Sequence, residues 1–119
     1  MRYTRLDFPH SLSDPESRFA FRSCDGNVVV DFRDWHNTAV QVEFCDTWQF
    51  SCCLQNGDLR ELPDGCMLEL FDSREIARLR ETRIAGSDDS IRHFVLSNNE
   101  DQWIEVIATS YAVRSGSAS

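Results

Sequence analysis

The sequence predicts an α+β fold that is mostly β: a bent antiparallel sheet or open barrel with one short α-helix at about residues 73–83. Three observations support this prediction. Apolar and polar residues alternate along most of the chain between residues 18 and 112, as they do in half-buried strands. Turn-forming pairs such as Asp25-Gly26 separate these runs at short intervals. A helix-initiation pattern stands out at one place, directly after Phe71.

The 119 residues are enough for one ordinary domain. We expect a single β-rich domain over residues 18–112, with eight Phe, three Trp and two Tyr as bulky core material. Residues 1–17 form an N-terminal segment that includes a short strand at most, because Pro9 and Pro15 interrupt it. The Ser-rich residues 113–119 are expected to be a disordered tail.

Four β-rich segments open the domain. In each segment, apolar residues alternate with polar neighbours. The alternating apolar residues are Phe19 and Phe21 in the first segment, Val28, Val30 and Phe32 in the second, Val40, Val42 and Phe44 in the third, and Trp48, Phe50, Cys52 and Leu54 in the fourth. The polar stretch 34–37 connects the second segment to the third. Short turns between alternating segments are typical of an antiparallel meander with one buried face, so we expect these four to pair in sequence order.

The second half of the domain contains the helix and two more strands. Residues 67–71 are either a strand or the approach to the helix. Asp72, with Glu75 three residues later, resembles a capping box and marks the helix start. Strands are expected near 93–96 and over 103–111, with a turn at 97–101 between them. The helix should cover one face or an open end of the sheet.

The charge of the chain bears on its partners. The formal net charge is −8, from 20 acidic residues against 12 arginines and no lysine. Nucleic acids and anionic membranes are therefore disfavoured, since both attract basic surfaces. A basic protein partner would be attracted, with faster association at low salt. The alternative is that the charge serves solubility alone.

No motif predicts a metal, a cofactor or a catalytic centre. The five cysteines lack the paired Cys-x-x-Cys spacing of zinc sites, and Cys52 and Cys53 would point to opposite faces of a strand. No phosphate-binding loop or nucleophile elbow occurs. The odd cysteine count fits free thiols, and the N-terminus lacks the apolar stretch of a secretory signal. We therefore expect a cytoplasmic protein without cofactors and more in keeping with binding than with catalysis.

Two alternatives to a protein-binding role stay open. A small-molecule binder or minor enzyme would use a pocket in the sheet interior, lined by Trp35, His36, Trp48, His93 and Trp103. A structural homodimer would pair its sheet edges or its helices. The arginines near the helix, at positions 74, 78, 80 and 83, fit a solvated face or a contact with an acidic patch.

The order of elements in the C-terminal half resembles a known type of protein. Its segments are Phe71–Leu79, Arg92–Leu96 and Glu100–Ala108, preceded by the strand pair 28–33 and 38–44. Over about residues 18–112 this order is similar to small bacterial β-rich domains of the immunity-protein type found in polymorphic toxin systems. The resemblance implies a compact, acidic, non-enzymatic protein that binds another protein, and it assigns a role to no particular residue.

The leading functional hypothesis is therefore an acidic protein-binding module, with an immunity-like inhibitor of a toxic partner as its more specific form. Acidic residues expected in the loops are the plausible contact points: Asp88, Asp89, Glu100 and Asp101.

Overall fold

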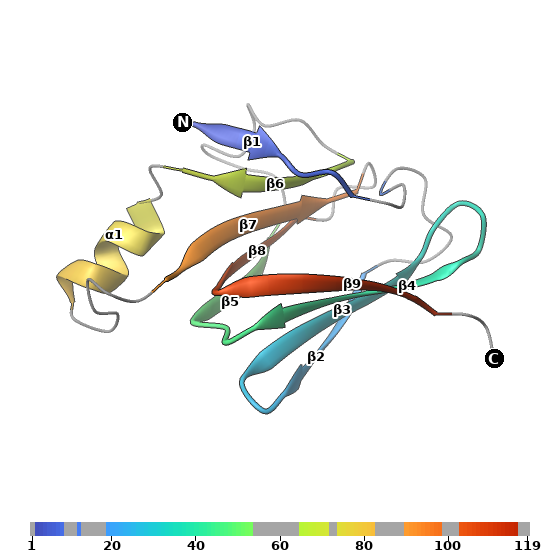
Figure 1. Ribbon diagram of the computed structural model, residues 1–119, viewed down its shortest axis with the longest axis horizontal. Coiled ribbons are helices and arrows are strands. Elements are labelled where there is room, and N and C mark those ends of the chain that lie inside the picture. Colours follow the sequence, from blue (N-terminus) through green and yellow to red (C-terminus); the bar gives the residue numbers. More distant parts are fainter. Residues whose placement is uncertain are drawn as a thin grey trace.

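The computed structural model describes residues 2–8, 12, 19–53, 65–71, 74–82, 90–98 and 103–116, the side chains at 24, 52, 53 and 116 excepted. The fold there is mostly β, with two antiparallel sheets and one short helix (Figure 1). The five-stranded sheet has the order β1 (Tyr3–Arg5), β6 (Met67–Leu70), β7 (Arg92–Ser97), β8 (Trp103–Ala108), β5 (Gln49–Cys53). The four-stranded sheet has the order β2 (Ala20–Cys24), β3 (Asn27–Arg33), β4 (Ala39–Cys45), β9 (Ser110–Gly116).

Two chain segments connect the two sheets at a corner. The chain passes from β4 in one sheet to β5 in the other, and it returns from β8 to β9 beside that crossing. β4 pairs with β9 and β5 pairs with β8, so the same two chain segments run side by side on both sides of the bend. Backbone bonds continue through the corner, from Thr109 N to Cys45 O at 3.0 Å and from Trp48 N to Ile107 O at 2.7 Å. The expected α+β, mostly β class with a bent antiparallel sheet is confirmed.

The expected four-strand meander is corrected to three strands. β2, β3 and β4 pair in sequence order, as predicted. β5 instead leaves for the other sheet and pairs with β8, more than fifty residues later in the chain. The physical reason is the break at Asp46, a non-glycine residue with a positive φ of 51°, which redirects the chain at the corner.

Hydrophobic side chains fill the space between the sheets. The predicted inward sets of β3 and β4 are confirmed, with Val30, Val42 and Phe44 fully buried. From the facing sheet, Phe94 and Ile104 meet them in the same cluster. Aromatic pairs connect the two sheets, Phe21 with Phe50 and Phe94 with Tyr111, each with ring centroids 5.2 Å apart. The first pair joins the edge strands β2 and β5 by side-chain packing rather than by hydrogen bonds between strands.

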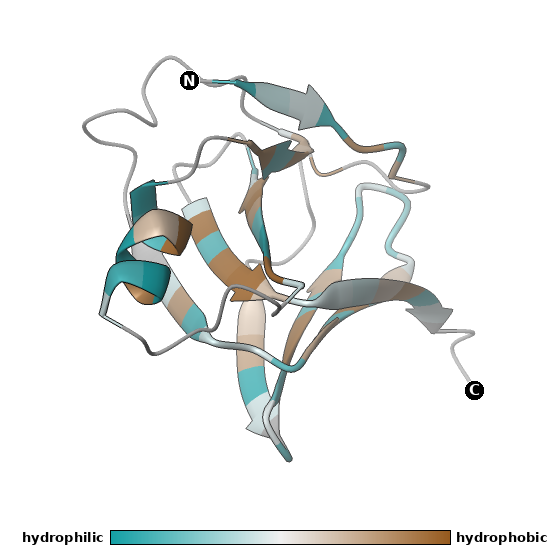
Figure 2. Cartoon of the chain, turned by 60° about the vertical axis from the view of Figure 1, so that its left-hand side comes forward, coloured by the Kyte–Doolittle hydropathy of each residue, from teal (hydrophilic) through white to brown (hydrophobic). Residues whose placement is uncertain are grey.

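The helix α1 (Arg74–Glu81) covers the outer face of the five-stranded sheet, as expected. Its single fully buried residue, Leu79, packs with Ile91 and Ile107, and Trp48 and Ile76 border this cluster. Most of α1 is hydrophilic in Figure 2, where teal residues predominate over brown ones. The predicted cap Asp72 and the residues 83–89 lie outside the described part. No helix of the described part is long and apolar enough to cross a membrane.

Two details of the sequence prediction need correction. Residues 113–116 are not a disordered tail but the end of β9, because their backbone pairs with the first half of β4 and Val113 packs against the core. Trp48 does not share a face with Phe50: it lies in the corner and packs under α1, whereas Phe50 borders the core between the sheets. The short N-terminal strand is confirmed as β1, which pairs with β6.

A polar bridge holds the β2–β3 turn against the corner. The Asn27 side chain donates to Glu43 Oε2 at 2.8 Å and accepts from Asp46 N at 3.0 Å. Arg114 pairs with the other oxygen of Glu43 at 2.9 Å. The hydrogen bond from Asn27, together with the charge of Arg114, holds the pKa of Glu43 below its ordinary value. The ionised carboxylate is therefore the form that the fold prefers.

This bridge predicts a pH dependence of stability. The pKa of Glu43 is lower in the folded than in the unfolded chain, so its stabilisation is present at neutral pH and is lost as the pH falls through the folded value. Glu43→Gln should therefore unfold more easily than wild type at pH 7, and the difference should shrink on acidification. Urea unfolding across that pH range measures this, with the exposed Asp7→Asn as the control. An unchanged difference at acid pH would contradict the role given to Glu43.

Candidate functional site

The structure separates the five residues predicted to line a pocket. Trp35 and His36 lie on the turn between β3 and β4, whereas Trp48, His93 and Trp103 belong to the five-stranded sheet or its corner. That turn and α1 are at opposite ends of the long axis in Figure 1. Trp103 is 1% exposed in an apolar cluster on the outer face, apart from the cluster that contains Trp48. The five residues therefore lie at separate locations, of which the β3–β4 turn and the outer face of the five-stranded sheet contain polar contacts.

The first location is the β3–β4 turn, residues 34–38, here called the tryptophan turn. Asp34 is 3% exposed, and its Oδ1 accepts from His36 N at 3.0 Å and from Thr38 N at 2.9 Å. The backbone adds bonds from Asn37 N to Asp34 O and from Asp34 N to Thr38 O. Asn37 adopts a φ of 65°, which asparagine tolerates better than most residues. One buried carboxylate therefore fixes the whole turn.

The turn presents an aromatic pair to solvent. Trp35 is 53% exposed, the largest value among the exposed large hydrophobic residues of the described part. The His36 ring lies against the indole, with centroids 3.5 Å apart and planes tilted by 34°. At the base of the turn, Arg33 donates to Asn37 O at 3.0 Å. The result is an exposed indole on a backbone that is already ordered.

The second location lies on the outer face of the five-stranded sheet. His93 of β7 is 3% exposed, and its Nε2 lies 3.1 Å from Glu105 Oε1 of β8. Such a carboxylate can orient an imidazole, as in acid–base catalysis. A catalytic triad would also need a nucleophile within hydrogen-bond distance of the His93 imidazole. The nearby hydroxyl residue Ser51 pairs with Glu105 from β5, so strand β8 separates it from His93 on β7, and the three residues do not form a triad.

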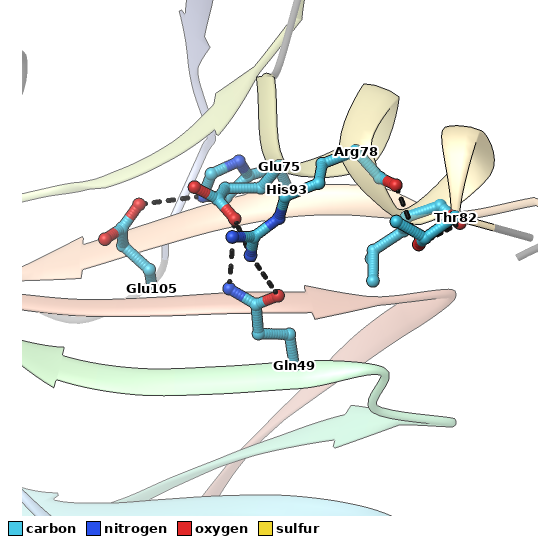
Figure 3. Close-up of polar contacts among 7 residues, drawn as sticks. Gln49, Glu75, Arg78, Thr82, His93 and Glu105 are labelled. Atoms are coloured by element: carbon cyan, nitrogen blue, oxygen red, sulfur yellow. Dashed lines mark hydrogen bonds and ion pairs between the residues drawn. The ribbon is translucent and has the colours of Figure 1, made fainter. Parts of the chain in front are cut away.

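Beside this pair, polar contacts connect α1 to the sheet (Figure 3). The Gln49 side chain of β5 donates to Glu75 and accepts from Arg78, each at 3.3 Å. Glu75 and Arg78 also pair with each other along the helix at 2.5 Å. Of the arginines predicted near the helix, Arg78 therefore helps to attach the helix to the sheet. These contacts, with Leu79 beneath them, explain the helix position without requiring a ligand.

Metal and thiol chemistry gain no support from the described residues. No group of three or more His, Cys, Asp or Glu there is arranged to hold a metal ion. Cys45 is a half-buried free thiol and Cys66 a buried one. The four acidic residues expected as contact points, between positions 88 and 101, lie outside the described part.

Sequence reasoning missed the role of Asp34. The signal was present: an Asp with an Asn three residues later, between two alternating apolar runs, is typical of a turn in which the Asp side chain bonds to the following backbone. It also missed the pair of Arg92 and Glu69, bonded twice at 2.9 and 2.6 Å, which raises the pKa of Arg92 further and positions its guanidinium over the Phe94 ring. No spacing along the chain points to that pair.

Comparison with family models, with curated proteins and with solved structures finds no match for this chain.

Proposed function

We propose that this chain is an acidic protein-binding module whose partner presents a basic surface. The observation that carries the proposal is the filled interior: fourteen buried hydrophobic residues, twelve of them on strands of the two sheets, form one cluster. Small molecules bind in concavities lined by convergent polar groups, and this core leaves the outer surface for recognition. A macromolecular partner is the class of ligand that binds across an outer surface.

The charge distribution supports a basic partner. The chain has 20 acidic residues against 12 arginines, a net charge of −8. Two pairs of neighbouring acids, Asp88 with Asp89 and Glu100 with Asp101, are the expected contact points. Acidic residues that are neighbours in the sequence attract a basic surface through their combined charge.

The more specific form of the proposal is an immunity-like inhibitor of a toxic partner. We place the module in the cytoplasm, since free thiols such as Cys45 and Cys66 persist in a reducing compartment. A basic enzyme that acts on nucleic acid would be a suitable target, because an acidic inhibitor competes for the surface that binds phosphate.

Salt dependence of partner capture tests the proposal. The tagged chain should capture one dominant basic protein from its host at low salt, and the amount captured should fall as salt is raised to about 0.5 M. A matched pair of variants separates contact from general attraction. One variant neutralises the expected contact points (Asp88→Asn, Asp89→Asn, Glu100→Gln, Asp101→Asn), and the other neutralises four exposed acids of the described part (Asp7→Asn, Asp25→Asn, Asp46→Asn, Glu81→Gln).

Both variants change the net charge equally, so only the first should lose capture if its residues make the contact. Equal loss would mean that overall charge acts alone. Capture of no partner at either salt would contradict the proposal, and sedimentation at two concentrations would then show whether the chain pairs with itself.

A further inference from the structure

We propose that the tryptophan turn is the anchor of the binding module: Trp35 inserts into an apolar cleft of the basic partner protein. This inference rests on the proposed function and adds the surface through which the partner is held. The turn forms one end of the molecule along its long axis (Figure 1), so a cleft can close around it without meeting the rest of the sheet.

The first argument is exposure. Burying an exposed tryptophan removes more apolar area from water than burying any other side chain, and tryptophan is enriched among residues that dominate binding energy. Tyr3, Phe21 and Phe71 are the other exposed large hydrophobic residues of the described part, at 43%, 39% and 40%. Phe21 already contacts Phe50, where it helps to join the sheet edges. Trp35 has the larger exposed fraction, and its ring lies against that of its neighbour His36.

The second argument is order. An anchor binds more tightly when little conformational freedom is lost on binding. The Asp34 carboxylate and two backbone bonds fix the turn, and the His36 ring restricts the indole. The arrangement has the features expected of a preformed contact.

The third argument concerns the chemistry of the cleft. His36 lies against the indole, which leaves the other ring face and the edges to the partner. An apolar cleft fits the exposed indole, because burying its apolar surface stabilises a complex. The net charge of −8 attracts the basic surface of the partner to the chain as a whole.

Substitution of Trp35 tests the inference with the full chain and the captured partner. Trp35→Ala should weaken the dissociation constant about 30-fold or more, the loss typical of a binding hot spot, and Trp35→Phe should weaken it less. Tyr3→Ala, which removes a similarly exposed ring from β1 in the other sheet, should bind like wild type. Because Trp35 is exposed, both variants at this position should fold, and their far-UV circular dichroism and unfolding midpoints should match wild type.

Fluorescence gives a second measurement. The emission of wild type should shift to shorter wavelength when the partner binds, since an exposed indole becomes buried, and Trp35→Phe should lose that shift. If wild type captures a partner and Trp35→Ala binds it equally well, the inference is wrong and the proposed function stands. If wild type captures no partner, the proposed function fails and the inference fails with it.

Discussion

Phe44→Ala should lower the free energy of unfolding by about 3–5 kcal/mol, the range found when a fully buried phenylalanine is truncated. Phe44 has no exposed surface, and its ring packs against Phe94 of the facing sheet and Tyr111 of β9. Its ring therefore connects three strands, β4 and β9 of one sheet and β7 of the other. Truncation leaves a cavity that the surrounding β-sheet backbone cannot readily close, since strand spacing is fixed by the ladder.

The matched control is Phe21→Ala. Phe21 is 39% exposed and contacts a phenylalanine of the other sheet at the rim, so its loss should cost less than about 1.5 kcal/mol. Urea unfolding followed by circular dichroism measures both variants. Similar losses for the two would show that the rim contributes as much as the centre, which would contradict the core described above.

The same experiment tests whether the two sheets unfold together. Both share the ribbon formed by β4–β5 and β8–β9, and Thr109 bonds to Cys45 at the bend through its backbone and its side chain, each at 3.0 Å. A disturbance at Phe44 should therefore reach both sheets, and a single cooperative transition is expected. Two separate unfolding transitions in Phe44→Ala would mean that the corner does not couple the unfolding of the two sheets.

The strands could be predicted because their signal is local. The alternation in β4 follows from the side-chain period of two, because one face of this strand is buried. The partner of each strand is not encoded in this way. β5 alternates just as a meander strand would, yet it pairs with β8, because the corner at Asp46 directs it to the other sheet. Likewise, the end of β9 has a tail-like composition but gains order from β4.

The candidate site was harder to predict for a related reason. Three tryptophans and two histidines looked equivalent in sequence, but burial divides them: Trp103 belongs to a core cluster, His93 pairs with Glu105, and Trp35 is exposed. Exposure depends on what packs above a residue, which often comes from distant parts of the chain. The turn itself was visible in the sequence at 34–37; the burial of Asp34 beneath it was not.

Asp34→Ala should lower the free energy of unfolding by about 2–4 kcal/mol, because two backbone N–H groups in a partly buried turn lose a charged acceptor together. Asp34→Asn keeps an acceptor oxygen of the same shape and should lose much less. Amide hydrogen exchange of His36 and Thr38 provides the specific measurement: both should exchange faster in the alanine variant, while the amides of β7 keep their order of protection. The loosened turn should also weaken partner binding although Trp35 is intact, because the anchor must then be ordered on binding. If the alanine variant bound as tightly as wild type despite faster exchange at the turn, exposure of the indole alone would account for its contribution, and the ordering assigned to Asp34 would serve only the stability of the fold.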